Sequence, residues 1–262
     1  MRRLFTLLLT LFFICAIANA ESIWVTCEGP GYDTPDEAAR AYVEAMNAGD
    51  MNTLVATFAV ETYVDHMDAM ASLERMKVFN TSMYYSVPVA GPLTRGILIE
   101  RRRNEITQLI YNAWLRNATQ NTDYEDAGSG GMVKMEDSAS IEAFLSVLNA
   151  SPMEQMVGHI TVTAVCAPNN PLISKYMPAN LNSEKVQQNM AQQLTNCGGD
   201  EFAERIVILD VDGAMGVQFM QCVRYGEKWY NYRTQSMIAT MLGLEVLSNG
   251  LVVGDALAGF LG

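Results

Sequence analysis

Four side chains that can donate or accept protons lie between Tyr63 and Asp68. A histidine or a carboxylate can act as a general base and a tyrosine hydroxyl can donate a proton, so the group has the residue types of a general acid–base site. Only residues three or four apart share one face of a helix. Tyr63 and His66 therefore lie on one face, whereas the adjacent Asp65 and His66 do not. Tyr63 and His66 are therefore the catalytic candidates, and a solvated turn is the simpler interpretation.

A cluster of arginines stands out in a chain with 17 basic and 29 acidic side chains. Guanidinium groups bind carboxylate and phosphate through paired hydrogen bonds, so the cluster predicts an anion site centred on Arg101, Arg102 and Arg103. The alternative is a solvated helix face that pairs with Glu100 and Glu105. Because no aromatic residues interleave with these arginines and the chain is strongly acidic, we expect no nucleic-acid partner.

Aromatic side chains in the C-terminal half have the types that line binding pockets. Pockets are mostly apolar with a few polar groups, so Trp229 and Tyr232 are candidates for ligand contacts. Aromatic residues at regular spacing more often fill a core, and that is the alternative. The chain has no dinucleotide fingerprint, phosphate-binding loop or nucleophile elbow. We therefore expect no cofactor, and we favour a binding protein over an enzyme.

Residues 1–20 have the three parts of a secretory signal peptide, namely a basic start, an apolar run and the small-residue site Ala18-Asn19-Ala20. The apolar run is shorter than the roughly 20 residues that span a bilayer. We therefore predict cleavage and export to a secreted or cell-envelope location. Loss of Arg2 and Arg3 with this leader changes the net charge from −12 to −14.

Four cysteines follow the leader, namely Cys27, Cys166, Cys197 and Cys222. Export favours disulfides, and four cysteines allow three pairings. We expect Cys166 to pair with Cys222 because both lie in predicted strands of one sheet, and buried free thiols are the alternative. No two cysteines have zinc-ligand spacing and the chain has 2 histidines, so we predict no metal site.

The clearest local signal for a helix begins at Thr34. Thr34 is a good N-cap, Pro35 suits the first helical position and Glu37 completes a capping box. Asp50 then caps a second short helix after the helix-ending Gly49. Apolar spacing predicts further helices over 60–78, 97–116 and 138–149, a turn-rich connection over 84–96, and a flexible loop over 117–131.

After Pro152 the apolar period changes from that of a helix to that of a strand. Ile160, Val162, Ala164 and Cys166 alternate with their neighbours, which predicts a half-buried strand. A helix over roughly 183–196 and three strands joined by tight turns come next. Helices first and an antiparallel meander last predict an α+β fold, with helices on one face of a curved sheet. The uncharged runs in the apolar residues 237–262 are too short to span a bilayer. These residues predict a cap on that sheet, because exposed apolar stretches of this length are rare in soluble monomers.

The opening helix pair with its Gly49-Asp50 step, and the closing strands through Lys228-Trp229-Tyr230, resemble the NTF2-like superfamily. The helix between the strands is similar to that of secreted, mostly uncharacterised members from gut-dwelling Gram-positive bacteria. The resemblance implies a cone-shaped domain over 21–236 with a helical insertion, followed by the tail 237–262. It also implies that an enzyme of this kind would hold its acid–base pair at the base of the cone.

Two functional hypotheses follow, and a third remains open. The leading one is a secreted, non-catalytic module that binds an unidentified small ligand or protein partner through the apolar meander face of Val217, Phe219 and Val223, either alone or as a sheet-to-sheet homodimer. The alternative is a small-molecule lyase or isomerase with an acid–base pair in the cone pocket. The third is an envelope protein whose tail contacts the membrane or wall.

Overall fold

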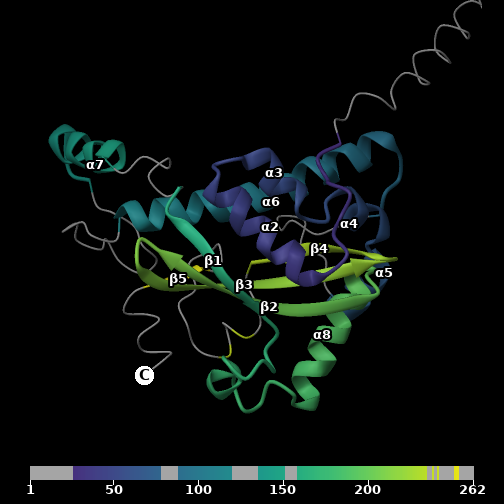
Figure 1. Cartoon of the computed structure of the whole chain (residues 1–262). Helices are drawn as coiled ribbons and strands as arrows, with labels where there is room; N and C mark the ends of the chain where they lie inside the picture. Colours follow the sequence, from purple (N-terminus) through teal and green to yellow (C-terminus); the bar gives the residue numbers. More distant parts are fainter. Residues whose placement is uncertain are drawn as a thin grey trace, which may run out of the picture.

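The computed structural model describes residues 26–77, 88–119, 135–150, 158–234, 238, 241 and 251–253. The fold is α+β, as predicted, with helices preceding an antiparallel sheet (Figure 1). The predicted leader and residues 120–131 of the predicted loop lie outside the described residues. The helices are α2 (Pro35–Asn47), α3 (Met51–Ala56), α4 (Glu61–His66), α5 (Ala69–Met76), α6 (Pro92–Thr119), α7 (Ser138–Ala150), the short 3-10 helix η3 (Ser174–Tyr176) and α8 (Glu184–Cys197).

The predicted helix pair at the start is confirmed as α2 and α3. Thr34 accepts a hydrogen bond from the amide of Glu37, whose carboxylate accepts one from the Thr34 amide in return. Asp50 caps α3 by accepting from the amide of Thr53. Each cap satisfies backbone donors that a helix start leaves unpaired, so both boundaries follow from local chemistry.

The helical middle differs from the prediction in two places. The single helix expected over 60–78 is wrong, because Asp68 accepts from the amide of Ala71 and starts α5 as a new helix after α4. As a result Met70, expected on an inward stripe, is 68% exposed. The turn-rich connection expected through residue 96 is also wrong, since α6 begins at Pro92 and includes Gly96. Proline fits a first helical turn, where its missing amide hydrogen is not needed.

The strands are β1 (Ile160–Cys166), β2 (Glu201–Val211), β3 (Ala214–Tyr225), β4 (Lys228–Arg233) and β5 (Leu251–Val253). They form one sheet in the order β1-β2-β3-β4, and β5 pairs with β3. β4 pairs with residues 221–225 of β3 and β5 with residues 216–218, so both strands lie along the same edge of β3. The β2–β3 hairpin turns at Asp212 and Gly213, which both have positive φ, as such two-residue hairpins require.

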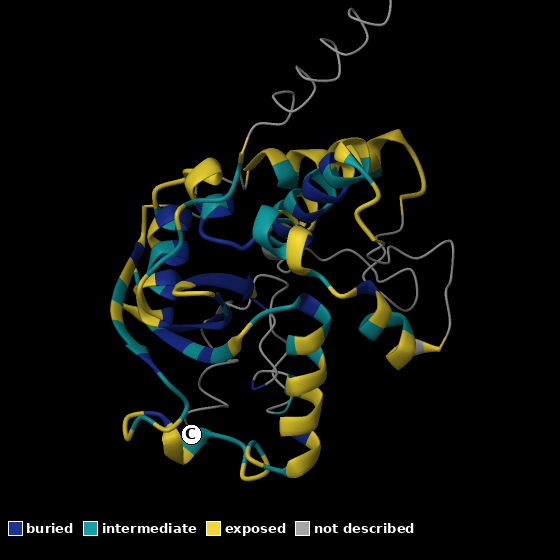
Figure 2. Ribbon diagram, turned by 90° about the vertical axis from the view of Figure 1, so that its right-hand side faces the viewer, coloured by how far each residue is buried: buried dark blue, intermediate teal, exposed yellow. Residues whose placement is uncertain are grey.

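Both faces of the sheet are filled by the protein's own chain (Figure 2). Helices α2, α3, α4 and α6 cover one face, where Val207, Leu209 and Met220 lie in the main core. On the other face, residues from the segment around η3 and from the C-terminal region cover Val217 and Phe219, while α8 lies against Val223. These three residues are 3%, 0% and 0% exposed, so the apolar face predicted for ligand or dimer contacts is not free. The predicted α8 is therefore present, and it fills part of that face.

The expected disulfide between Cys166 and Cys222 is not formed, and all four described cysteines are free. A β-bulge between Val162 and Ala164 shifts the register of β1 and moves the residues after it to the opposite face of the sheet. Val162 accordingly packs with the helix-covered core, whereas Cys166 lies in the cluster on the other face. Cys222 belongs to the helix-covered core, so the sheet separates the two sulfur atoms.

Candidate functional site

Arg102, predicted to bind an anion, is buried within the fold. Its guanidinium donates to the carbonyl oxygen of Tyr232 at 2.6 Å and to that of Ala59 at 3.4 Å. It also contacts Glu105 at 3.3 Å and lies over the ring of Tyr63, 4.7 Å from the centroid. The side chain thus ties α6 to α4 and β4, and its hydrogen-bonding capacity is used by the protein itself.

The two predicted aromatic ligand contacts also lie in the interior. Tyr232 is 4% exposed and stacks on Phe202, with ring centroids 5.1 Å apart. Burial raises the pKa of the Tyr232 hydroxyl to about 12. Trp229 is 8% exposed and lies in the helix-covered core. The geometry therefore supports a role in core packing for both residues rather than in ligand contact.

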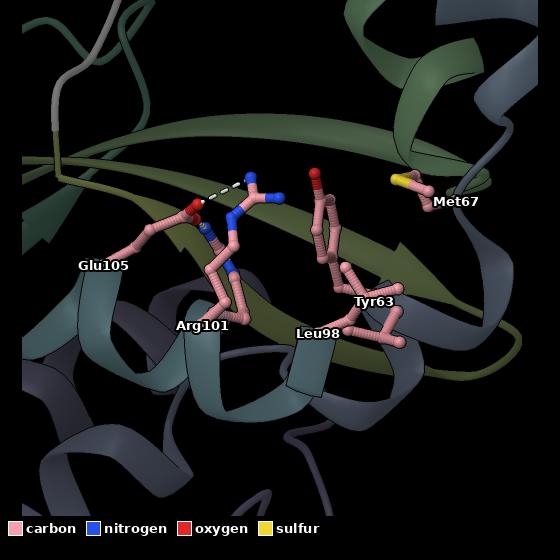
Figure 3. A pocket seen from close by; sticks show the side chains of 7 residues that line it. Tyr63, Met67, Leu98, Arg101 and Glu105 are labelled. Atoms are coloured by element: carbon pink, nitrogen blue, oxygen red, sulfur yellow. Dashed lines mark hydrogen bonds and ion pairs between the residues drawn. The ribbon is translucent and has the colours of Figure 1, made fainter. Parts of the chain in front are cut away.

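A crevice does open beside Tyr63, but it is too small for a substrate (Figure 3). It is lined by residues of α4 and α6, and across it Arg101 forms an ion pair with Glu105 at 3.1 Å. Its volume is about 10 Å³. A cavity of that size holds at most about one water molecule, so no reactant fits between these side chains.

Tyr63 and His66 do not form an acid–base pair around a common space. Tyr63 contacts Arg102 and Tyr232, whereas the ring of His66 lies against Tyr225 at 5.1 Å. His66 Nδ1 is hydrogen-bonded to the carbonyl oxygen of Thr62 within the same helix. The neighbouring Asp65 forms a two-point ion pair with Arg95, at 2.6 and 2.7 Å. Each of these side chains therefore has a packing or pairing partner.

The three consecutive arginines do not gather around one space. Arg101 and Arg102 both line the small crevice and both contact the carboxylate of Glu105. Arg102 also reaches the carbonyl of Tyr232 in the core. Arg103 instead lines an open groove of about 450 Å³ between α3 and the segment before α2. The predicted single anion site is thus not assembled.

The groove beside Arg103 has little reactive character. Its thiol, Cys27, has a pKa raised to about 12 by burial and by the adjacent Glu61 carboxylate. Glu28 also lines the groove, but its carboxylate accepts hydrogen bonds from the amides of Val60 and Thr62, and burial raises the pKa of its carboxyl. A protonated thiol and a fully engaged carboxylate are poor nucleophiles and bases.

The two edges of the sheet differ. The β4 edge is closed by the chain's own N-terminal part, because Tyr32 exchanges two backbone hydrogen bonds with Trp229, and Asn231 does so with Thr57 and Ala59. At the opposite edge, no described strand pairs with the outer side of β1.

A groove of about 330 Å³ runs along that open β1 edge, and we call it the edge groove. Val162 and Ala48 are its exposed or partly exposed apolar residues. The longest charged side chains on its α2 wall are Arg40 and Glu44, which are 4.0 Å apart and well exposed. Its lining includes Arg40, Glu44 and Asn47 from α2, Ala48 just after this helix, and Thr161 and Val162 from β1.

The hydrogen bonds at the start of β1 show which backbone groups face outward. The carbonyl of His159 accepts from the amide of Asp212, so the backbone groups of residue 159 point toward β2. Because the direction of the backbone groups alternates along an antiparallel strand, those of residues 160 and 162 point away from β2. The amide of Ile160 indeed donates outward, to Oδ1 of Asn47 at 2.8 Å. The amide and carbonyl of Val162 therefore point along the open edge, where no described residue pairs with them.

Sequence analysis missed this edge, although it predicted the strand. Alternation identifies a strand but not its position in the sheet, which depends on pairing across distant segments. A usable signal was present in the composition of β1, since an edge strand without lysine, proline or any charge lacks the usual protection against pairing. Among the described residues, no group of three or more metal-ligating side chains occurs, and no helix is long and apolar enough to cross a membrane.

Comparison with known proteins gives no family for this chain. No family model matches it, and no curated protein does. It is similar to the crystal structure of a cystatin-like protein from Ruminococcus gnavus ATCC 29149, with 10% identity and a TM-score of 0.42, over 84% of this chain and 44% of that one. The chain thus spans less than half the length of the structure that it matches.

The resemblance to the NTF2-like superfamily is corrected by this comparison, because the structure found is described as cystatin-like, which is a distinct fold. The motifs that suggested it are real but local. A capped helix pair with a Gly-Asp step and a tight hairpin satisfy their own backbone, whatever the fold around them. Such motifs identify elements rather than a family.

Proposed function

We propose that this protein is an exported, non-catalytic binding module that holds an extended segment of a partner protein along the open edge of β1. Export rests on the leader in the sequence. Binding by strand addition uses backbone hydrogen bonds for affinity and side-chain pockets for specificity.

One observation carries the proposal, namely the outward-facing backbone of Val162 beside the edge groove. An unpaired edge is a template for another strand. The edge groove gives that strand room, because it lies between β1 and α2 rather than over a filled sheet face. The opposite edge already shows how such pairing works here, through the bonds between Tyr32 and Trp229.

The β-bulge limits the length of the added strand. The outward-facing groups before it are the carbonyl of Ile160 and both backbone groups of Val162, and the register changes before Ala164. An added segment therefore gains only a few backbone hydrogen bonds, each with a net contribution of about 0.5–1.5 kcal/mol. Such a site suits a transient partner rather than a permanent subunit.

The test compares the native chain with Val162→Pro and Val162→Ala, using random peptides displayed on phage. Proline removes the outward amide hydrogen but leaves the inward hydrogen bonds of Thr161 and their pairing with β2. We expect extended peptides to be enriched on the native chain, retained in part on Val162→Ala, and lost on Val162→Pro. Circular dichroism of both variants serves as the control for folding. Equal enrichment on Val162→Pro and the native chain would refute strand addition at β1.

A further inference from the structure

We infer that the segment bound along β1 is basic on one face and apolar on the other, with lysine or arginine alternating with residues such as valine. This inference rests on the proposed function, since it concerns the occupant of the same edge. It follows from the different surroundings of the two faces of β1 next to the edge.

The face toward α2 selects apolar side chains. Val162 points to that face, where it packs partly against the main core. In an added strand, the residue beside Val162 points to the same face and enters the edge groove. In the groove this side chain meets Val162 and Ala48. The charged residues of the same groove, Arg40 and Glu44, form an ion pair with each other at 4.0 Å. A valine-sized side chain buries apolar surface at this position, and a charged one gains no unpaired partner.

The opposite face selects basic side chains. Thr161 lies on it and is paired across the sheet with the exposed Asp210, which accepts one hydrogen bond from the amide of Gly213 and keeps its second oxygen toward solvent. Asp212, at the hairpin turn, already pairs with His159 at 3.0 Å, so Asp210 is the carboxylate that a basic side chain would meet. β1 itself has no charged residue. An added strand would lie two strand spacings from β2, or about 9.6 Å. A lysine or arginine beside Thr161 reaches across the threonine toward Asp210 over that distance.

The charge of the whole protein disfavours a second copy of this chain as the occupant. Pairing β1 with its own copy would place the two Asp210 residues three strand spacings apart, or about 14 Å, where salt largely screens their repulsion. Each chain has a net charge of −12, however, and two such chains repel one another. A basic partner instead gains attraction from Asp210 and from the charge of the whole protein.

Asn47 sets where the added strand ends. Its side-chain oxygen takes the outward amide hydrogen of Ile160, and its backbone carbonyl accepts from the amide of Gly158. Asn47 thus occupies the place that a longer added strand would take at the start of β1. The segment therefore pairs at Val162 with a fixed register, which keeps its apolar residue in the edge groove and its basic residue beside Thr161.

The experiment measures the binding of three synthetic peptides to the full chain without its leader. In these peptides valine alternates with lysine, with serine or with glutamate. We expect the lysine peptide to bind about tenfold more tightly than the glutamate peptide at low salt, and we expect this preference to shrink as salt screens the charges. In Asp210→Asn the preference should fall to about threefold or less. Asparagine keeps the oxygen that accepts from the amide of Gly213, so the hairpin is preserved.

A matched control and two further readouts make the outcomes distinct. Glu227→Gln removes another exposed carboxylate, in the distant β3–β4 turn, and it should leave the lysine preference unchanged. If Val162→Pro abolishes binding but all three peptides bind the native chain equally, strand addition stands and the basic occupant is refuted. If no peptide responds to Val162→Pro, both proposals fail. A dimer of the native chain that Val162→Pro dissociates would overturn the basic occupant in favour of a second copy.

Discussion

The guanidinium of Arg102 lies 4.7 Å from the centroid of the Tyr63 ring and donates to the carbonyl of Tyr232 at 2.6 Å. Three elements distant in the sequence, α6, α4 and β4, therefore meet at one buried cation. The same residue that suggested an anion site in the sequence holds the helices to the sheet.

Replacement of Arg102 by methionine should destabilise the protein strongly. The change leaves the carbonyls of Tyr232 and Ala59 without their donor and removes the contact with Tyr63, so we expect a loss of about 2–4 kcal/mol in the free energy of unfolding. Urea denaturation followed by circular dichroism measures it. Arg103→Met is the matched control, since Arg103 lines an open groove, and we expect a change within about 0.5 kcal/mol. Similar losses for both variants would contradict the structural role of Arg102.

Glu28 should make the protein less stable at neutral pH than at mildly acidic pH. Burial raises the pKa of Glu28 in the folded state, so the folded chain holds its proton at pH values where the unfolded chain has lost it. The free energy of unfolding therefore rises as the pH falls through the raised pKa of Glu28 toward the ordinary value of 4.5. Glu28→Gln should remove this dependence, as shown by unfolding free energies at pH 7 and pH 5.

Asp50 provides the control of opposite sign. Its hydrogen bonds with Thr53 lower the pKa of its carboxyl, so its contribution to stability is present above the ordinary pKa and is lost as the pH falls through the lowered one. Asp50→Asn should therefore leave the pH dependence that arises from Glu28 unchanged. A native chain and a Glu28→Gln variant with parallel pH profiles would count against the burial of this carboxylate.

The cysteines should be reduced and unreactive in the folded protein. A pKa of about 12 keeps Cys27 protonated at pH 8, and burial raises the pKa of Cys166, Cys197 and Cys222 as well. Ellman's reagent should therefore label the folded chain slowly. In denaturant without reductant, it should titrate four thiols in the chain without its leader. Fewer than four would reveal a disulfide, and its assignment to Cys166 and Cys222 would contradict their separation by the sheet.

The elements that could be predicted from sequence are those specified by neighbouring residues. The reciprocal hydrogen bonds of Thr34 and Glu37 fix the start of α2 within one helical turn. The Asp212-Gly213 turn likewise specifies the β2–β3 hairpin through its own backbone angles. In both cases the deciding interactions span only a few residues, so the pattern is visible in the sequence.

The features that could not be predicted depend on distant contacts. Val217 and Phe219 have the alternation of a free sheet face, and only the packing of Ile238 and Val252 shows that the face is filled. The side on which Cys166 lies depends on one extra residue in β1, which no periodicity reveals. The open edge of β1 likewise emerges only from the strand order.

The most direct test of the account is hydrogen exchange at the amide of Val162, measured by NMR with and without the lysine–valine peptide. Without peptide, we expect this amide to exchange rapidly, while that of Thr161 is protected by its pairing with β2. Saturation with peptide should slow exchange at Val162 at least about tenfold and leave Thr161 little changed. A Val162 amide that is already protected in the free protein, or that the peptide does not protect, would contradict the central claim.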